Sequence, residues 1–324
     1  MRTLVTGGAG YVGSVIVEEL LTAGHTPIVY DGFAKGHRAA VAPGVIVVEG
    51  DVADTERLRQ TMRDHQIEAV IHMAALIEVG LSVTNPNRFF ETNVVGSVSV
   101  VRAMIDTGVK RLVFSSTAAV YSDPERLPIL EDDPTVPTNP YGDSKLMVER
   151  ILSWDAPTHG LVCTALRYFN AAGASERNGE DHTPETHLIP LALRAAAEGR
   201  PLTLYGTDYP TPDGTAVRDY IHVRDLAQAH TLALGRAEPG LRIYNVGSGA
   251  GYSVRQVVET TRAVTGLPLA VEERPRRPGD QAATVASSQR IKDELGWRPH
   301  YDNLDAILES AWQWRLAHPN GYAQ

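Results

Sequence analysis

A tyrosine and a lysine able to move protons lie four residues apart, as Tyr141 and Lys145 in the run YGDSK. Pro140 precedes them and apolar residues follow at helical spacing, so we predict a helix over roughly 141–153. The spacing puts both side chains on one face, one turn apart. An ammonium group beside a phenol lowers the phenol pKa, which makes Tyr141 a candidate general acid and base near neutral pH.

Hydroxyl side chains gather just after a predicted strand over 111–114, in the run FSSTAAVY that begins at Phe114. Ligands of open parallel sheets bind beyond the carboxyl ends of the strands. A hydroxyl in this place can hydrogen-bond both a substrate oxygen and the tyrosine. We therefore select Thr117 as the third catalytic residue, with Ser116 as the second choice.

A glycine-rich turn follows the first predicted strand. In TGGAGYVG, the residues Gly7, Gly10 and Gly13 have the spacing G-x-x-G-x-x-G and open a helix over 11–24. The first glycine permits a tight turn, the second lets backbone amides approach a pyrophosphate, and the third lets helix and strand pack closely. The helix N-terminus favours the negative phosphates. Strand, turn and helix together predict a dinucleotide site.

Two aspartates end the next strands. Asp31 lies roughly 20 residues beyond the glycines, where an acid holds the adenosine ribose hydroxyls. A carboxylate there repels a 2′-phosphate, which favours NAD over NADP, although the nearby Lys35, His37 and Arg38 weaken that preference. Asp51 either contacts the adenine or caps the following helix, and the sequence leaves both roles open.

Short apolar runs alternate with helical stretches in the first half of the chain. Such runs suit strands buried on both faces of a parallel sheet with right-handed crossovers. We predict an α/β fold, a Rossmann-type doubly wound parallel sheet with a smaller α/β substrate-binding lobe. The predicted strands cover 3–5, 27–31, 45–49, 69–72, 111–114 and 161–167, and further helices cover 85–107, 188–199, 224–236, 253–265 and 304–317.

The second half of the chain is richer in loops. Segments 170–185, 207–215 and 275–279 carry many glycines, prolines and charges, and loops of this length are uncommon unless they bind something. We assign them to the substrate. The predicted domains are an NAD-binding domain of residues 1–168 and about 220–247, and a substrate domain of residues 169–219 and about 248–324.

Composition excludes several classes of protein. The chain has 324 residues, 43% of them apolar, and a formal charge of −9, which disfavours binding to nucleic acid. Its single cysteine, Cys163, permits no intrachain disulfide, and we expect no metal ligand set. No apolar run approaches the ~20 residues of a membrane span, and no signal peptide is apparent, so we expect no membrane partner and a cytoplasmic location.

The motifs together resemble the extended short-chain dehydrogenase/reductases, and within them the UDP-galactose (UDP-glucose) 4-epimerases. The matching stretches run from residue 3 to about 317 and include TGGAGYVGS, FSSTAAVYS, NPYGDSKLMVERIL, LRYFNAAGA, GEDHTPETHLIP, YGTDYPTPDGTAVRDYIHV, YNVGSGAGYSV and RRPGD. The resemblance implies tightly bound NAD and interconversion of UDP-galactose and UDP-glucose through a 4-keto sugar. It also implies a homodimer formed by the helices over 85–107 and 141–153.

The resemblance assigns roles to individual residues. Tyr141, Lys145 and Thr117 match the catalytic set. The residues matched to the NAD site, besides Tyr141 and Lys145, are Gly7, Gly10, Tyr11, Val12, Gly13, Asp31, Asp51, Val52, Ala74, Asn93, Ser115 and Tyr168. The residues matched to the UDP-sugar site are Ser116, Thr117, Asn170, His187, Leu188, Tyr205, Arg218, Arg277, Asp280 and Thr284.

Three positions depart from the family pattern. Ile77 replaces a lysine near the cofactor, and Ser122 replaces a common glycine. Thr284 stands where some relatives carry a bulky tyrosine beside the sugar C2 group, so we hypothesise that UDP-N-acetylhexosamines are also accepted.

Other functions remain open at this point. A 4,6-dehydratase is disfavoured because Ala118 and Ala119, rather than an acid, follow Thr117. Epimerisation of a UDP-pentose or UDP-uronate is an alternative that the uridine motifs do not exclude. A non-catalytic NAD sensor is disfavoured because the tyrosine, lysine and hydroxyl set is intact.

Overall fold

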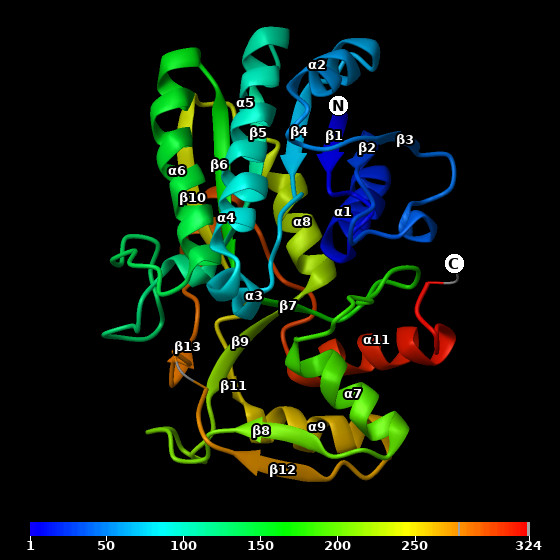
Figure 1. The fold of residues 1–324 in the computed structure, drawn as a ribbon, viewed down its shortest axis with the longest axis vertical. Helices are drawn as coiled ribbons and strands as arrows, with labels where there is room; N and C mark the ends of the chain where they lie inside the picture. The colour runs from blue at the N-terminus through cyan, green and yellow to red at the C-terminus, as the bar shows by residue number, and fades with distance from the viewer. Residues whose placement is uncertain (278, 323–324) are drawn as a thin grey trace.

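A seven-stranded parallel sheet forms the centre of the protein. The computed structural model describes residues 1–277 and 279–322 (Figure 1). In space the strands follow the order β10-β6-β5-β4-β1-β2-β3, which is a doubly wound order, and the predicted α/β class is confirmed. The strands are β1 (Arg2–Thr6), β2 (Thr26–Asp31), β3 (Ile46–Glu49), β4 (Ala69–His72), β5 (Arg111–Thr117), β6 (Val162–Tyr168) and β10 (Gly240–Val246).

Helices cover both faces of this sheet. On one face α1 (Tyr11–Thr22) packs against α8 (Val223–Ala233). On the other face α5 (Gly96–Thr107) packs between α2 (Thr55–Asp64) and α6 (Pro140–His159). The chain therefore forms a helix–sheet–helix sandwich, and the sheet lies at its centre (Figure 1).

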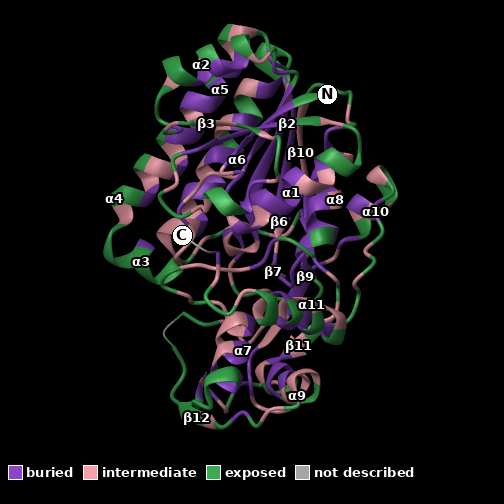
Figure 2. Cartoon of the chain, turned by 90° about the vertical axis from the view of Figure 1, so that its right-hand side faces the viewer, coloured by how far each residue is buried: buried purple, intermediate pink, exposed green. Residues whose placement is uncertain are grey.

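Neighbouring residues of β1 enter opposite cores. Val5 packs in the core beneath α1 and α8, whereas Leu4 packs in the core beneath α2 and α5, and both are fully buried. Successive side chains of a strand point to opposite faces, so an unbroken apolar run suits a strand covered on both sides. Figure 2 shows these buried strands between the helical layers.

A second lobe lies below the sheet in Figure 1 and contains shorter strands. One of its sheets is built around β9, and a separate pair is formed by β8 and β12. The strands are β7 (Asn170–Ala172), β8 (Leu202–Tyr205), β9 (Val217–His222), β11 (Gly251–Ser253), β12 (Val271–Arg274) and β13 (Ala283–Thr284). The helices of the chain's second half, besides α8, are α7 (Leu188–Glu198), α9 (Val254–Thr265), α10 (Gln289–Leu295) and α11 (Leu304–Ala317).

The helix predicted over 85–107 is not continuous. A π-helical segment, η2 (Phe90–Val95), interrupts it. Within this segment the Asn93 side chain bonds Leu76 and Ser144, which belong to other elements, and the Asn93 carbonyl accepts from Ser97 Oγ at 2.5 Å. The helix predicted over 141–153 continues to His159. The helix predicted over 85–107 begins with α4 (Pro86–Phe89). Short elements that the sequence did not predict are η1 (Arg38–Ala40), α3 (Val79–Thr84) and η3 (Ala118–Val120).

Cys163 is buried in β6, and Trp312 and Trp314 are buried on α11, so these side chains pack in the interior. Among the helices described here, none combines the length and the apolar character that crossing a membrane requires. The predicted cytoplasmic location stays a prediction.

A buried ion pair ties α6 to β6. The Arg167 guanidinium donates to both carboxylate oxygens of Glu149, from Nε at 2.9 Å and from Nη2 at 2.6 Å. The two side chains are only 4% and 3% exposed. Arg167 also donates to the Tyr121 hydroxyl at 2.8 Å, and Ser116 donates to Glu149 at 2.5 Å. This network fixes α6 relative to the strand ends where the predicted catalytic residues lie.

Replacing Arg167 by Ala should destabilise the protein strongly, by about 3–5 kcal/mol, because Glu149 would keep a buried charge without its partner. The free energy of unfolding in urea measures the effect. Arg63→Ala, at an exposed arginine on α2, is the control and should change stability by less than about 0.5 kcal/mol. Equal effects of the two substitutions would contradict the structural role of the pair.

Candidate active site

The start of α6 positions the predicted tyrosine and lysine. The side chain of Asn139 caps the helix by accepting a hydrogen bond from Gly142 N at 2.9 Å. Tyr141 and Lys145 follow one turn apart, as predicted. A Cβ at Gly142 would collide with the carbonyl oxygen of Ala119, so glycine is needed for the helix to start this close to the end of β5.

Lys145 is directed at the end of β5. Its Nζ donates to the backbone oxygen of Ser115 at 2.8 Å and to Ser115 Oγ at 3.2 Å, and lies 4.9 Å from the centroid of the Phe114 ring. The residue is 2% exposed. Burial lowers the pKa of Lys145 to about 7, because the ammonium ion loses its hydration. Small changes around this group therefore decide whether it carries charge near neutral pH.

The phenol of Tyr141 shows the reverse of the predicted shift. Burial raises its pKa, and the hydroxyl of Thr117 lowers it by a smaller amount. The predicted depression by Lys145 is wrong here, because the ammonium group points to Ser115 and desolvation dominates. The interaction between Tyr141 and Thr117 does bring together two of the three predicted catalytic residues.

The register of β5 and β6 brings Tyr168 next to the predicted catalytic residues. Thr117 pairs with Tyr168 across β5 and β6. Burial raises the pKa of Tyr168. The hydroxyl of Ser115 lowers this pKa by a smaller amount, and the phenol of Tyr141 raises it. The predicted nicotinamide-side tyrosine thus lies beside the predicted catalytic residues.

Ser116, the second choice for the catalytic hydroxyl, faces the other way. Strand alternation places Ser115 and Thr117 on one face of β5 and Ser116 on the opposite face. The hydroxyl of Ser116 is used by Glu149 in the buried network. The geometry favours Thr117 over Ser116.

The start of α1 has the properties of an anion site. Gly10 is the N-cap, no side chain caps the helix, and its first turn contains no acidic residue. Amides in the first turn of a helix have no intrahelical acceptor and carry partial positive charge. The preceding Gly7 has φ +70°, and a Cβ there would collide with Ala74 N at the end of β4. This donor set, next to Gly13 and the strand ends, fits a dinucleotide diphosphate.

Asp31 and Asp51 both shape turns. Asp31 accepts hydrogen bonds from Ala9 N at 2.9 Å and Phe33 N at 2.8 Å, so it holds the glycine turn and its own loop. Asp51 accepts from Ala53 N at 2.8 Å. The cap of α2 is supplied by a different residue, Asp54. Asp51 therefore stabilises a turn before α2 and does not cap the helix, which was one of its two predicted roles.

Other residues predicted at the cofactor site lie around the glycine turn. The Tyr11 hydroxyl donates to the backbone oxygen of Gly173 at 2.6 Å and so links α1 to the second lobe. Val12 is half-buried on α1. Val52 is buried after β3, where a Cβ on Gly96 of α5 would meet its side chain.

Asn93 is held between the end of β4 and α6. It accepts from Leu76 N at 2.8 Å and donates to Leu76 O and to Ser144 Oγ, both at 3.0 Å. Its side chain therefore positions the loop before α3. His72 is a satisfied buried histidine, because its ring contacts the hydroxyls of Thr6 at 2.6 Å and Ser97 at 2.9 Å, and burial lowers its pKa to about 3.

The second lobe brings four of the predicted uridine and diphosphate residues into two pairs. The Arg277 guanidinium carbon lies 3.9 Å from the centroid of the Tyr205 ring. Arg218 Nη2 lies 3.8 Å from Asp280 Oδ1. Thr284 pairs with Arg218 in the register of β13 and β9, so the residue predicted beside the sugar lies next to a predicted phosphate ligand.

The remaining substrate residues lie nearer the sheet. Asn170 begins β7, and its Nδ2 donates to the backbone oxygen of Asp219 at 2.8 Å. His187 is the N-cap residue of α7, and Leu188 is its first residue. These positions connect the catalytic strand ends to the second lobe through β7 and α7.

The sequence did not indicate what lies beside Ile77. Lys35 Nζ forms an ion pair with Glu78 Oε1 at 2.9 Å, and Ile77 N donates to Glu78 Oε2 at 3.2 Å. A lysine from the loop after β2 thus reaches the segment where the family lysine is missing. The contact joins residues 43 positions apart (78 minus 35), which local spacing does not reveal.

Comparisons with known proteins agree with this geometry. A profile of the NAD dependent epimerase/dehydratase family matches residues 3–247. The chain belongs to this family. The UDP-glucose 4-epimerase of Corynebacterium glutamicum is 50% identical over 98% of this chain and 96% of its own length.

Solved structures give the same result. A crystal structure of a UDP-glucose 4-epimerase superimposes with a TM-score of 0.96 at 42% identity and covers 100% of both chains. The UDP-glucose 4-epimerase of Brucella ovis in complex with NAD has a TM-score of 0.93 at 44% identity, covering 97% of this chain and 98% of its own. The resemblance predicted from the sequence is confirmed.

The lowered pKa of Lys145 predicts a pH dependence of stability. Between about pH 7 and 10.5 the unfolded lysine binds a proton that the folded one does not, so stability rises with pH through this window. From pH 6 to 9, wild type freed of nucleotide should gain about 2–3 kcal/mol relative to Lys145→Met in urea unfolding. Lys110→Met, at an exposed lysine, is the control that should show no such difference. Parallel pH curves for wild type and Lys145→Met would refute the shift.

Proposed function

We propose that the residues at the carboxyl end of β5 carry out epimerisation at C4 of a UDP-sugar. The observation that carries the proposal is the meeting of Tyr141, Lys145 and Thr117 beside the uncapped start of α1. The chain is an NAD-dependent UDP-sugar 4-epimerase, which interconverts UDP-galactose and UDP-glucose.

The chemistry that NAD supplies when bound is hydride transfer from and back to C4, with no net oxidation of the sugar. Tyr141, as the phenolate, takes the proton of the 4-hydroxyl and returns it after the 4-keto sugar has turned over. Thr117 hydrogen-bonds the same substrate oxygen. Burial raises the pKa of Tyr141, and the hydrogen bond with the Thr117 hydroxyl opposes that shift, so Thr117 is the residue that favours the phenolate in this geometry. Lys145 holds the nicotinamide ribose.

The two lobes bind different ligands. The sheet domain, residues 1–168 and about 220–247, binds NAD through the first turn of α1 and through Asp31. Residues 169–219 and about 248–324 bind the UDP-sugar. Arg218 and Arg277 are the cationic donors that a diphosphate requires. Binding energy gathered at the nucleotide lies away from C4, so the sugar can rotate while the diphosphate stays held.

The first test follows the anomeric proton signals by NMR when purified protein is incubated with UDP-galactose and no added NAD. The expected outcome is the appearance of UDP-glucose, because NAD stays bound through the cycle. If no change occurs even with NAD added, the sugar assignment fails, and UDP-pentoses and UDP-uronates are the next substrates.

Replacing Tyr141 by Phe should lower kcat in this assay by about 10²–10⁴-fold or more, because the proton acceptor is removed. Thermal stability and NAD content should stay close to wild type. Tyr301→Phe is the matched control, because the one hydrogen bond of its hydroxyl among residues 1–277 and 279–322 is accepted from Arg224, at 3.0 Å near the surface. Activity retained by Tyr141→Phe would eliminate the proposed mechanism.

Acceptance of UDP-N-acetylhexosamines rests on the small side chain of Thr284, half-buried in β13. The same NMR assay with UDP-GalNAc should show formation of UDP-GlcNAc. Thr284→Tyr should reduce this reaction by about 10–200-fold while leaving turnover of UDP-galactose nearly unchanged. Absence of turnover by wild type disproves the wider specificity.

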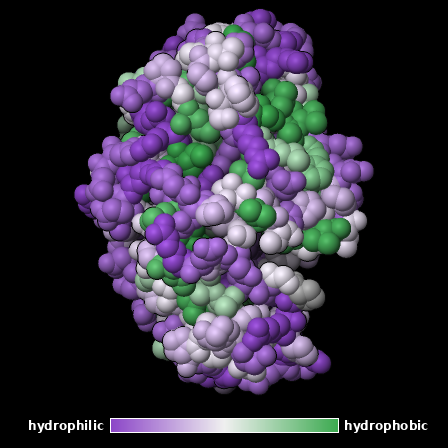
Figure 3. Space-filling model, turned by 90° about the vertical axis from the view of Figure 1, so that its left-hand side faces the viewer, coloured by the Kyte–Doolittle hydropathy of each residue, from purple (hydrophilic) through white to green (hydrophobic). Residues whose placement is uncertain are grey.

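A homodimer is supported by apolar side chains exposed on the helices expected to pair. Trp154 on α6 is 77% exposed and Val95 on η2 is 55% exposed. Figure 3 looks onto the side of the molecule where α6 lies and shows hydrophobic side chains at the surface. Sedimentation velocity should give a dimer for wild type and for Leu316→Glu, a control on α11, and a monomer for Val95→Asp combined with Trp154→Glu. A monomeric wild type would rule out the dimer.

A further inference from the structure

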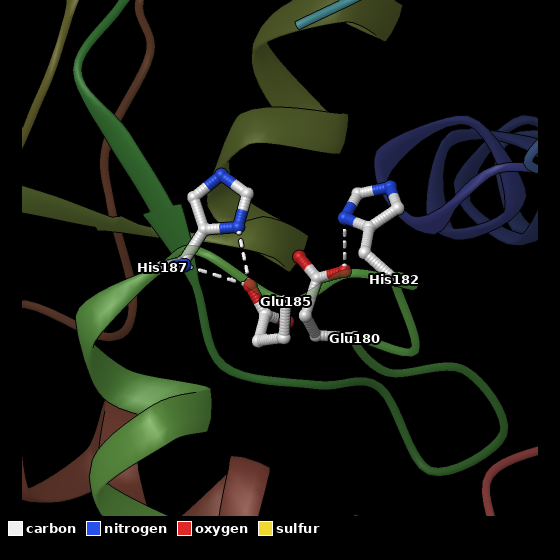
Figure 4. A group of neighbouring side chains, drawn as sticks. All are labelled: Glu180, His182, Glu185 and His187. Carbon is white, nitrogen blue, oxygen red and sulfur yellow. Dashed lines mark hydrogen bonds and ion pairs between the residues drawn. The ribbon is translucent and has the colours of Figure 1, made fainter. Parts of the chain in front are cut away.

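Two histidines and two glutamates converge in the loop between β7 and α7. This His–Glu cluster consists of Glu180, His182, Glu185 and His187 (Figure 4). One ligand atom from each residue lies within 4.8 Å of the other three. We propose that the cluster binds a divalent transition-metal ion, with zinc as the best fit, through two imidazole nitrogens and two carboxylate oxygens.

The side chains form two pairs that face each other (Figure 4). His187 Nδ1 lies 2.8 Å from Glu185 Oε1, and His182 Nδ1 lies 2.5 Å from Glu180 Oε1. The centroids of the two imidazole rings are 5.9 Å apart. All four donors therefore surround a common point rather than lying along a line.

Glu180 and His182 contact each other as a close pair whose alignment is poor for a hydrogen bond. Glu180 Oε1 and His182 Nδ1 are buried, yet neither makes a hydrogen bond of acceptable geometry with any described residue. The Glu180 side chain is nine-tenths buried, with 10% of its surface exposed. Buried carboxylate oxygens are normally satisfied. A cation at the centre of the cluster satisfies both atoms at once.

Backbone hydrogen bonds hold the Glu185 carboxylate in an orientation suited to metal binding. Its side chain is 1% exposed, and its Oε1 accepts hydrogen bonds from Thr186 N at 2.6 Å and His187 N at 2.7 Å. No donor among the described residues reaches its Oε2. The backbone thus fixes the carboxylate and leaves an oxygen for the metal, the kind of support that metal ligands normally have.

The donor set selects the class of ion. Imidazole suits Zn²⁺, Cu²⁺ and Ni²⁺, whereas Ca²⁺ and Mg²⁺ prefer sites made of oxygen atoms. Four ligands at about 2.0–2.2 Å in a tetrahedron lie about 3.3–3.6 Å apart. To reach these values, the two His–Glu distances of 2.8 Å and 2.5 Å must lengthen slightly, and ligand separations of up to 4.8 Å must shorten by roughly 1 Å. Side-chain rotation permits both changes. Two carboxylates also balance the charge of a dication.

A metal with four protein ligands has no open position, so its role is structural rather than catalytic. It would clamp residues 180–187 and fix the N-cap of α7, where His187 and Leu188 begin the helix. Bound through Nδ1, His187 keeps Nε2 free for another partner. The expectation of no metal rests on the single cysteine, although Glu180, His182, Glu185 and His187 form two Glu-x-His units five positions apart.

Metal content tests the proposal directly. The holoenzyme is treated with a chelator, dialysed against excess ZnCl₂ and then against metal-free buffer, and analysed by inductively coupled plasma mass spectrometry. About one zinc per chain is expected for wild type and for His159→Ala, at an exposed histidine on α6. His182→Ala and Glu185→Gln should each weaken zinc binding by about tenfold or more in a competition titration. Co²⁺ should give the visible absorption of a tetrahedral site in wild type and His159→Ala but not in His182→Ala or Glu185→Gln.

Thermal unfolding separates loss of the site from loss of the fold. Zinc should raise the Tm of wild type and of His159→Ala and leave the Tm of His182→Ala and Glu185→Gln unchanged, while all four proteins keep their NAD. Less than about 0.1 zinc per chain in wild type, or zinc binding that both cluster substitutions leave intact, would overturn the proposal.

Discussion

Parallel strand pairing is the constraint on which the site depends, because it brings the carboxyl ends of β1, β4, β5 and β6 to one edge of the sheet. The glycine turn follows β1, Thr117 ends β5, and Tyr168 ends β6 in register with Thr117. The start of α6 must then lie against the end of β5, which Gly142 permits. Residues far apart in the sequence become one reactive group through strand pairing and through the side-chain network of Arg167 and Glu149 that holds α6.

Features contained in a single element could be predicted from the sequence. The glycine turn and the Tyr141–Lys145 pair are set by local spacing, and both lie where expected. The direction of the Tyr141 pKa shift could not be predicted, because it depends on burial and on the hydrogen bond from Lys145 to Ser115. The π-helical segment at Asn93 likewise depends on bonds to residues elsewhere in the fold.

Fewer elements of the second lobe could be predicted from the sequence, again because contacts between distant residues form them. Strands such as β7, β11 and β13 have only two or three residues, too few for a periodic pattern. They are held by pairing with β9, whose partners come from both earlier and later parts of the chain. The residues of the His–Glu cluster do repeat in the sequence, as two Glu-x-His units, but only the path of the loop between β7 and α7 brings the four side chains together.

The path of the chain between the lobes has a consequence for how such proteins diversify. After β6 the chain enters the second lobe, returns to add α8 and β10 to the sheet domain, and leaves again for β11 to β13. It then returns once more with α10, which packs against β10, and ends in α11. No single junction separates the two lobes, so neither can be inherited as an exchangeable module. Recombination would need several simultaneous crossover points. New sugar specificities in this architecture must therefore arise by point substitution and changes of loop length rather than by domain shuffling.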